Sequence, residues 1–202
     1  MTESSTLRKA GGIILAGGKS TRMGRDKASL PFGPELLLQR VVRILRAVVE
    51  PIVVVAAAGQ ELPPLAGDVL LATDDQPSRG PLEGLLAGLS KLAAERPDVG
   101  AAYATSCDVP LLTAEFIREM IARLGDADIA VPIEDGFPHP LAAVYRTSVL
   151  PHVGELLAAD QLRPVFLFDR VRTNRIDVSD LRAIDPELHS LKNCNRPEDY
   201  EE

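Results

Sequence analysis

Continuous apolar runs alternate with amphipathic stretches along the first two thirds of this chain. Runs of β-branched and small apolar residues predict buried strands at 11–16, 51–57, 68–73, 101–106 and 127–131. Apolar residues at helical spacing predict helices over 35–49, from Pro81 onward, and from an N-cap at Thr113 to a stop at Gly125. Apolar strands that alternate with helices are typical of a mostly parallel sheet covered on both faces.

The pattern becomes less regular after about residue 132. A strand at 141–145, a helix at 149–157 and a strand at 172–178 are predicted there, and we expect this part to shape a pocket over the sheet edge. No linker, repeat or low-complexity segment divides the chain. We therefore predict one three-layer, Rossmann-like α/β domain over residues 11–202, preceded by a flexible tail at 1–10.

Composition narrows the class of protein. The 202 residues carry a net charge of −7, and aromatic residues make up only 4%, which disfavours a nucleic-acid partner because base stacking requires aromatics on a basic surface. Cys107 and Cys194 form no metal-binding pattern. The N-terminus has no signal-peptide core and no apolar run reaches membrane-spanning length, so we expect a cytoplasmic protein without a membrane partner.

A loop of glycines and cations follows the first predicted strand. Residues 17–27 contain Gly17, Gly18 and four basic side chains in an otherwise acidic chain; the basic residues are Lys19, Arg22, Arg25 and Lys27. Glycines allow a backbone to approach a ligand closely, and cations neutralise an anion. The loop predicts a polyphosphate cradle at the carboxyl end of a strand, where open α/β sheets bind ligands. A tight turn with solvated cations is the simpler alternative.

The same loop only superficially resembles a Walker A motif. Gly18-Lys19-Ser20-Thr21 matches the end of that motif, but the required first glycine would stand at position 13, which is Ile13. Gly12 is one residue too early, so the spacing argues against a P-loop kinase or ATPase.

A second candidate site follows the strand at 101–106. Asp108 comes just after this strand and before Pro110, so its carboxylate is expected over the same sheet edge as the glycine loop. Mg²⁺ takes one or two carboxylates together with phosphate oxygens and waters, which makes Asp108 a candidate metal ligand. An aspartate that caps a turn is the structural alternative.

Three further segments carry weaker signals. The loop at 73–84 leads into a helix, and its Asp74 and Gly80 are candidates for nucleotide binding, although a surface loop with solvated acids explains them too. His139 lies between two prolines and is either a binding residue or structural. Asn193 and Asn195 precede a terminal helix and either reach a metal or phosphate or form a turn.

The order of these motifs resembles the molybdenum cofactor guanylyltransferase family. The matching segments are 15–24, 26–27, 80–84, 107–111 and 193–199. The resemblance runs from about residue 11 to the end, and it implies a glycosyltransferase-A-like fold of the nucleotide-diphospho-sugar transferase type. Leu-Ala-Gly-Gly at 15–18 is similar to guanylyl members, whereas cytidylyl relatives more often have Leu-Ala-Ala-Gly.

The resemblance implies that GTP and molybdopterin cofactor give the guanine dinucleotide cofactor and pyrophosphate. Because such a cofactor is labile, we also expect transient contact with proteins that supply or receive it. The implied nucleotide contacts are Leu15, Ala16, Gly17, Gly18, Lys27, Asp74, Gly80 and Asp108. Asp108 would also hold Mg²⁺. The implied contacts on the molybdopterin side are His139, Pro140 and Asn195.

Residue chemistry is consistent with that reaction. The molybdopterin phosphate would attack the α-phosphorus of GTP, with Mg²⁺ on Asp108 and with Lys27 and Arg22 offsetting charge on the leaving pyrophosphate. One departure concerns the base, because the family often has an asparagine after the second strand, where this chain has alanines at 56–58. A cytidylyl or sugar-phosphate nucleotidyltransferase and a non-catalytic nucleotide-binding module remain the alternatives.

Overall fold

A single mixed sheet forms the centre of the protein in the computed structural model, which describes residues 10–17, 26–74, 76 and 79–194. The strand order is β10-β7-β9-β6-β1-β4-β5, and the short β8 pairs with β7. The strands are β1 (Ala10–Leu15), β4 (Ile52–Ala57), β5 (Leu70–Asp74), β6 (Ala101–Ser106), β7 (Ile129–Glu134), β8 (Phe137–Pro138), β9 (Ala142–Arg146) and β10 (Thr173–Asp177). The predicted strands are confirmed, with ends shifted by a few residues.

The sheet is mostly parallel, as predicted. Strands β5, β4, β1 and β6 are parallel neighbours, and β10 is parallel to β7. Strand β9 runs antiparallel between β6 and β7. Because β6 and β7 both oppose β9, they share a direction, and the carboxyl ends of β1, β4, β5, β6 and β7 lie at one edge of the sheet.

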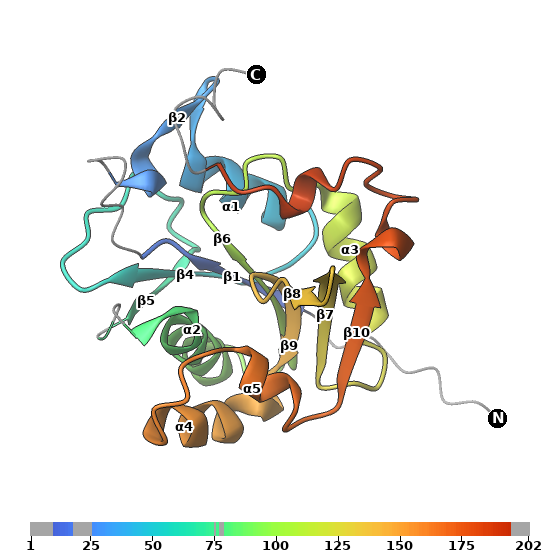
Figure 1. Cartoon of the computed structure of the whole chain (residues 1–202). Helices are drawn as coiled ribbons and strands as arrows, with labels where there is room; N and C mark the ends of the chain where they lie inside the picture. The colour runs from blue at the N-terminus through green and yellow to red at the C-terminus, as the bar shows by residue number, and fades with distance from the viewer. Residues whose placement is uncertain (1–9, 18–25, 75, 77–78, 195–202) are drawn as a thin grey trace.

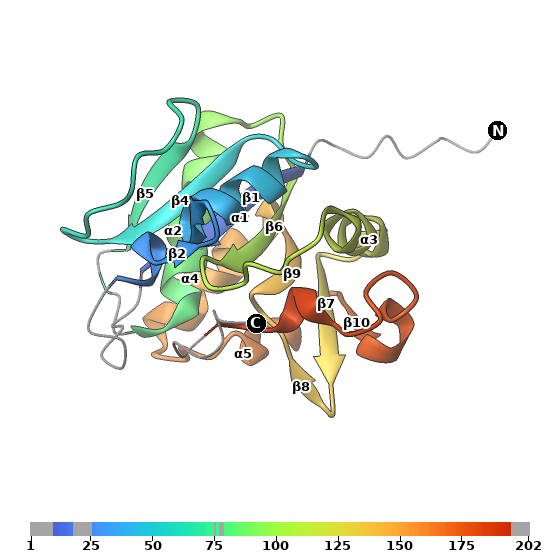
Figure 2. The ribbon, with the colours of Figure 1, turned by 90° about the horizontal axis from the view of Figure 1, so that it is seen from above.

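Helices cover both faces of this sheet and complete three layers (Figures 1 and 2). Helices α1 (Leu37–Arg46) and α3 (Ala114–Leu124) pack through one hydrophobic cluster. Helices α2 (Pro81–Glu95), α4 (Leu150–Ala158) and α5 (Val165–Phe168) pack through a second cluster on the other face. The sheet lies between the two clusters, and the predicted α/β fold class is therefore confirmed.

Local sequence signals account for several helix ends. The Thr113 hydroxyl accepts a hydrogen bond from the backbone N–H of Phe116 at 3.2 Å and caps α3, as predicted. Gly125 ends the same helix with φ +49°, a conformation that disfavours a side chain. Pro81 occupies the first turn of α2, where its missing N–H costs no hydrogen bond.

The expected helix over 35–49 is too long at both ends. Residues Glu35–Leu36 form β3, which pairs with β2 (Pro31–Phe32) across a turn in which Gly33 has φ +59°. Helix α1 consequently begins at Leu37, and it ends at Arg46 before a turn leads into β4. Helical periodicity did not reveal this hairpin, because two-residue strands leave no recognisable alternation.

Other short elements were also missed. They are β8, α5 and the 3-10 turns η1 (Lys27–Ser29), η3 (Thr147–Val149), η4 (Val178–Leu181) and η5 (His189–Leu191). Of the expected tail at 1–10, Ala10 begins β1 and the rest lies outside the described residues. None of the helices in the described part of the chain is both long and apolar enough to cross a membrane.

Candidate functional site

Asp108 lies at the carboxyl edge of the sheet, two residues after β6. The backbone N–H of Cys107 donates to the Leu15 carbonyl at 3.2 Å, which ties the end of β6 to the end of β1. Asp108 is only 7% exposed, so its carboxylate requires partners that compensate for lost water. The chain topology therefore places a shielded carboxylate beside the start of the glycine loop.

Three donors surround the Asp108 carboxylate. Lys27 Nζ lies 2.7 Å from Oδ2 and forms an ion pair across 81 positions of sequence. The Ser106 hydroxyl donates to Oδ1 at 2.5 Å, and Asn193 Nδ2 donates to the same oxygen at 3.2 Å. Two predicted site residues, Lys27 and Asp108, are thus in direct contact.

Lys27 reaches this position from a short, capped turn. One oxygen of Asp26 accepts from the backbone N–H of Ala28 at 3.0 Å and begins η1. The Lys27 side chain is 21% exposed, so its ammonium group lies against Asp108 while part of the side chain still meets solvent. The capped turn thus fixes the backbone of a lysine whose ammonium group lies at the carboxyl edge of the sheet.

Gly17 approaches the protein itself closely. A Cβ at this position would lie 3.0 Å from the backbone nitrogen of Ala57, which is tighter than real Cβ contacts normally are. Ala16 N–H donates to the Val55 carbonyl at 2.9 Å, and Leu15 and Ala16 are buried. Any ligand at 15–17 would therefore meet backbone groups, and the glycine at 17 is explained by packing against β4.

Asp74 and Gly80 lie at the same end of the sheet, near the loop after β5. Asp74 is the last residue of β5, and its Oδ1 accepts from the backbone N–H of Gln76 at 2.9 Å. Gly80 has φ +86° at the start of α2, which favours glycine for backbone reasons. Both residues thus have a structural role in the loop, and nucleotide binding would be an additional role.

His139 is held in place on the other side of Asp108. Its Nε2 lies 3.1 Å from Glu134 Oε2. Its backbone N–H donates to the Pro132 carbonyl at 2.9 Å, and its carbonyl accepts from Ala142 N–H at 3.1 Å. The Pro140 carbonyl accepts from the Tyr145 hydroxyl at 2.7 Å, so this loop is fixed at several points.

Strand register relates this loop to Asp108. Tyr103 of β6 lies opposite Val144 of β9, which lies opposite Ala130 of β7. Strand β7 is therefore two strands from β6 and runs in the same direction, so its carboxyl end, with Glu134, lies at the same edge of the sheet as Asp108. Figure 2 shows β8 at the end of β7, beyond the rest of the sheet.

Some residues of the expected site lie outside the described part of the chain; they are Gly18, Lys19, Arg22, Arg25 and Asn195. Asn193, which was expected beside a metal or in a turn, contacts Asp108 directly. The described part of the chain therefore joins Lys27, Asp108 and Asn193, with His139 two strands away.

The surroundings of Asp108 fit a Mg²⁺ site of the type completed by substrate. Among the described residues no group of three or more His, Cys, Asp or Glu side chains stands together, so a cage made by the protein is absent from them. Mg²⁺ commonly uses one carboxylate with phosphate oxygens and waters. The Lys27 ammonium group against Oδ2 shows that the Asp108 carboxylate can pair with a positive charge at the sheet edge.

Cys107 is next to Asp108 but is not suited to nucleophilic chemistry. Burial, followed by the negative charge of Asp108, raises the pKa of its thiol to about 12. The thiolate is the reactive form of cysteine, and it is therefore scarce here at neutral pH. Cys107 instead contributes to the hydrophobic cluster under α1 and α3.

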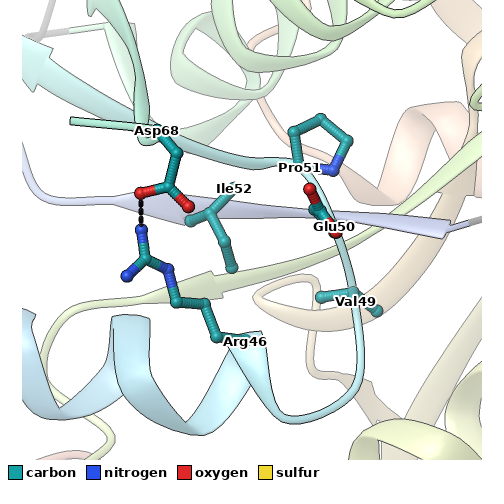
Figure 3. A pocket seen from close by; sticks show the side chains of 6 residues that line it. All are labelled: Arg46, Val49, Glu50, Pro51, Ile52 and Asp68. Atoms are coloured by element: carbon teal, nitrogen blue, oxygen red, sulfur yellow. Dashed lines mark hydrogen bonds and ion pairs between the residues drawn. The ribbon is translucent and has the colours of Figure 1, made fainter. Parts of the chain in front are cut away.

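A hollow at the opposite edge of the sheet is unrelated to this site. It has a volume of about 230 Å³ and surrounds the amino end of β4; its lining is Arg46, Val49, Glu50, Pro51, Ile52 and Asp68 (Figure 3). Arg46 and Asp68 pair with each other there. Since ligands of open α/β sheets bind at carboxyl ends, Asp108 and not this hollow marks the candidate site.

Sequence reasoning missed three polar residues of the site region. Ser106 binds Asp108, Glu134 binds His139, and Gln60 bonds to Ala16, Asp26 and Ala57. The position of Ser106, two residues before a candidate ligand, was the one available signal. Nothing near Gln60 or Glu134 in the sequence indicates their partners.

Comparisons with known proteins show similarity over most of the chain. Residues 12–173 match the MobA-like NTP transferase domain. A protein of Mycobacterium tuberculosis (strain ATCC 25618 / H37Rv), named probable molybdenum cofactor guanylyltransferase, is 40% identical over 177 residues, or 86% of each chain. The similar solved structures include molybdopterin-guanine dinucleotide biosynthesis protein A from Archaeoglobus fulgidus, with a TM-score of 0.75, 20% identity and 94% of each chain covered.

Another similar solved structure is that of Rv0371C in complex with manganese from Mycobacterium tuberculosis H37Rv. It has a TM-score of 0.62 and 17% identity, and the match covers 84% of this chain and 88% of that one. At this identity the likeness shows the fold alone.

The fold, together with the family match, defines a nucleotidyltransferase. Within that class, the chain belongs to the MobA-like NTP transferase family, whose domain covers most of its length.

Proposed function

We propose that this protein transfers GMP from GTP to the terminal phosphate of molybdopterin cofactor and releases pyrophosphate. The relatives named molybdenum cofactor guanylyltransferase and the Leu-Ala-Gly-Gly sequence at 15–18 support guanine over other bases. The single observation that carries the chemistry is the ion pair between Lys27 and Asp108 at the carboxyl edge of the sheet. Cytoplasmic action and transient contact with proteins that supply or receive the cofactor are part of the proposal.

The reaction requires positioning and charge stabilisation. An oxygen of the acceptor phosphate forms a bond to the α-phosphorus of GTP, and the bond from that phosphorus to the β-phosphate oxygen breaks. Lys27 leaves Asp108 to contact the triphosphate and offsets the charge that develops on pyrophosphate. Arg22 assists from the same loop. No group of the protein needs to become covalently attached.

Asp108 is the proposed Mg²⁺ ligand, with Ser106 and Asn193 holding its carboxylate in orientation. When bound, Mg²⁺ supplies charge neutralisation to the phosphate oxygens. The manganese named for a protein of the same fold supports a divalent metal, and the Asp108 carboxylate is an oxygen ligand of the kind that Mg²⁺ takes together with phosphates and waters.

The nucleotide and the acceptor would lie on opposite sides of Asp108. On the nucleotide side are the proposed contacts Leu15, Ala16, Gly17, Gly18, Asp74 and Gly80. On the acceptor side are the proposed contacts His139 and Pro140, in the loop between β8 and β9, and Asn195. Phe137, which is 75% exposed beside Glu134, offers an aromatic face to the pterin ring there.

Nucleotide binding with Mg²⁺ tests the function directly. Calorimetry with GTP, CTP and ATP on the wild type, Asp108→Asn and Asp68→Asn should show GTP preference that depends on Mg²⁺. Asp108→Asn should lose most of this metal dependence because its neutral side chain binds the cation poorly, whereas Asp68→Asn at the opposite edge should retain it.

Each other result has a clear meaning. Preference for CTP would assign the substrate to a cytidylyl relative. Absence of nucleotide binding would reject the function, and an unchanged metal titration in Asp108→Asn would reject that ligand.

A further inference from the structure

We propose that Gln60 is a positioning residue of this reaction, because its side-chain amide connects the start of the glycine loop to the turn that carries Lys27. The inference rests on the proposed function and concerns a residue to which no motif assigns a role. Gln60 follows β4 by three residues, after a turn in which Gly59 has φ +75°. Its backbone N–H donates to the Ala57 carbonyl at 3.0 Å, which directs the side chain back toward the sheet edge.

Both ends of the Gln60 amide are engaged. Oε1 accepts from the backbone N–H of Ala57 at 2.9 Å. Nε2 donates one hydrogen to the Ala16 carbonyl at 3.0 Å and the other to Asp26 Oδ2 at 2.7 Å. A primary amide has two N–H hydrogens, so the donor capacity of Nε2 is used, and one half-buried side chain holds three separate segments together.

These bonds continue as far as the candidate metal ligand. The second oxygen of Asp26 caps η1 through Ala28 N–H at 3.0 Å, and the Lys27 side chain from that turn reaches Asp108 at 2.7 Å. Ala16 belongs to the segment proposed to contact the nucleotide, and Lys27 is proposed to contact its phosphates. Gln60 therefore fixes the distance between two groups that bind different parts of one substrate.

Gln60 also bears on the missing asparagine. The resembled family often has an amide side chain directly after the second strand, where this chain has alanines at 56–58. The amide of Gln60 comes from three residues beyond Ala57 and returns to the backbone of Ala57. An amide group is thus present at the end of β4, although residues 56–58 are alanines.

The two links are separable by substitution. Gln60→Leu keeps the size and removes both, so the KM for GTP should rise and kcat should fall, each about tenfold. The carboxylate of Gln60→Glu has no hydrogen to donate and brings a second negative charge next to Asp26. We therefore expect this variant to have the lowest kcat and the highest KM for GTP of the set. The double variant Gln60→Glu/Asp26→Asn reverses the donor and acceptor of the Asp26 link and leaves the Ala16 carbonyl without a donor.

The expected signature is a split between the kinetic constants. The double variant should recover kcat to within about threefold of the wild type while the KM and the calorimetric Kd for GTP stay about tenfold raised. Gln39→Leu is the matched control, because Gln39 also bonds through both amide ends, to Leu36 N–H and the Pro64 carbonyl, and neither partner is a proposed substrate contact. It should lower the thermal midpoint without changing either constant.

Two results would overturn the inference while the proposed function stands. The first is a Gln60→Leu variant whose GTP affinity and kcat equal those of Gln39→Leu. The second is a double variant whose kcat is no higher than that of Gln60→Glu. The second comparison tests the inference even if Gln60→Leu does not fold. A wild type that neither binds GTP nor releases pyrophosphate would instead remove the proposed function, and the inference with it.

Discussion

The two halves of the sheet on either side of Asp108 are built differently. Strands β1, β4 and β5 on the nucleotide side are parallel, and helix α2 packs directly against all three. On the acceptor side, β9 runs antiparallel and β7 ends in the hairpin with β8. Parallel strands need long crossover connections, which usually contain a helix, whereas a hairpin needs only a tight turn. The nucleotide half is therefore a layered frame, and the acceptor half carries a projecting loop.

Glycines also differ between the two halves in how closely they are packed. In the nucleotide half, a Cβ on Gly12 would lie 2.4 Å from Leu45 and one on Gly88 would lie 2.6 Å from Ile13, so these glycines allow close packing. In the acceptor half, Gly125 and Gly136 meet nothing within 4 Å and instead have positive φ angles. Asp135 and Gly136 both have positive φ, as the two central residues of a type I′ hairpin turn require. Gly59 and Gly80 in the nucleotide half also have positive φ, so close packing against glycine, and not turn geometry, is what distinguishes that half.

We expect the largest effect from substitution of Lys27, which pairs with Asp108 between the two halves. Lys27→Ala should lower kcat about 10²–10³-fold, because it removes a cation that stabilises the leaving group. Lys91→Ala is the matched control, since Lys91 pairs with Glu95 on the surface of α2. Pyrophosphate release under saturating GTP measures the effect, and turnover equal to that of Lys91→Ala would reject the role of Lys27.

A smaller effect should separate the two halves. Phe137→Ala and His139→Ala should each raise the KM for the molybdopterin acceptor about tenfold, because each removes a proposed contact to the pterin side. The KM for GTP should not change. Phe166→Ala, an exposed phenylalanine in α5, serves as the control. Equal acceptor KM values for Phe137→Ala and Phe166→Ala would remove the hairpin from the acceptor site.

The smallest effect is on stability in the acceptor half. Thr113→Ala should lower the free energy of unfolding by about 1 kcal/mol, since it removes the cap of α3. Thr113→Ser, which keeps the hydroxyl, should recover most of the loss. Urea unfolding measures the difference, and GTP affinity should stay constant in both. A loss of GTP affinity in Thr113→Ala would show that the halves are more tightly coupled than the packing indicates.

Sequence patterns identified the regular elements better than the irregular ones. Strands β1, β4 and β6 were predictable because a strand buried on both faces must be apolar throughout. The β2–β3 and β7–β8 hairpins were missed, since such short strands carry no periodicity. For the same reason the helix expected from residue 35 begins only at Leu37.

Candidate site residues divide in a similar way. Asp108 was recognisable because a carboxylate directly after a buried strand stands at the edge where ligands bind. The partners of Asp108 were not, because Lys27 and Asn193 lie 81 and 85 positions away along the chain. Gly17 was recognised for its possible approach to a ligand, but its tightest contact is the backbone of β4.

The sequence by itself determined the layered α/β architecture, the charge of the glycine loop and the family. These properties follow from local composition and from motifs that keep their spacing. Only the tertiary structure decided that Lys27 pairs with Asp108, that Gln60 joins Ala16 to Asp26, and that the β7–β8 hairpin lies at the same edge of the sheet as the candidate metal ligand. Those contacts depend on strand order and register, which bring together side chains that no local pattern relates.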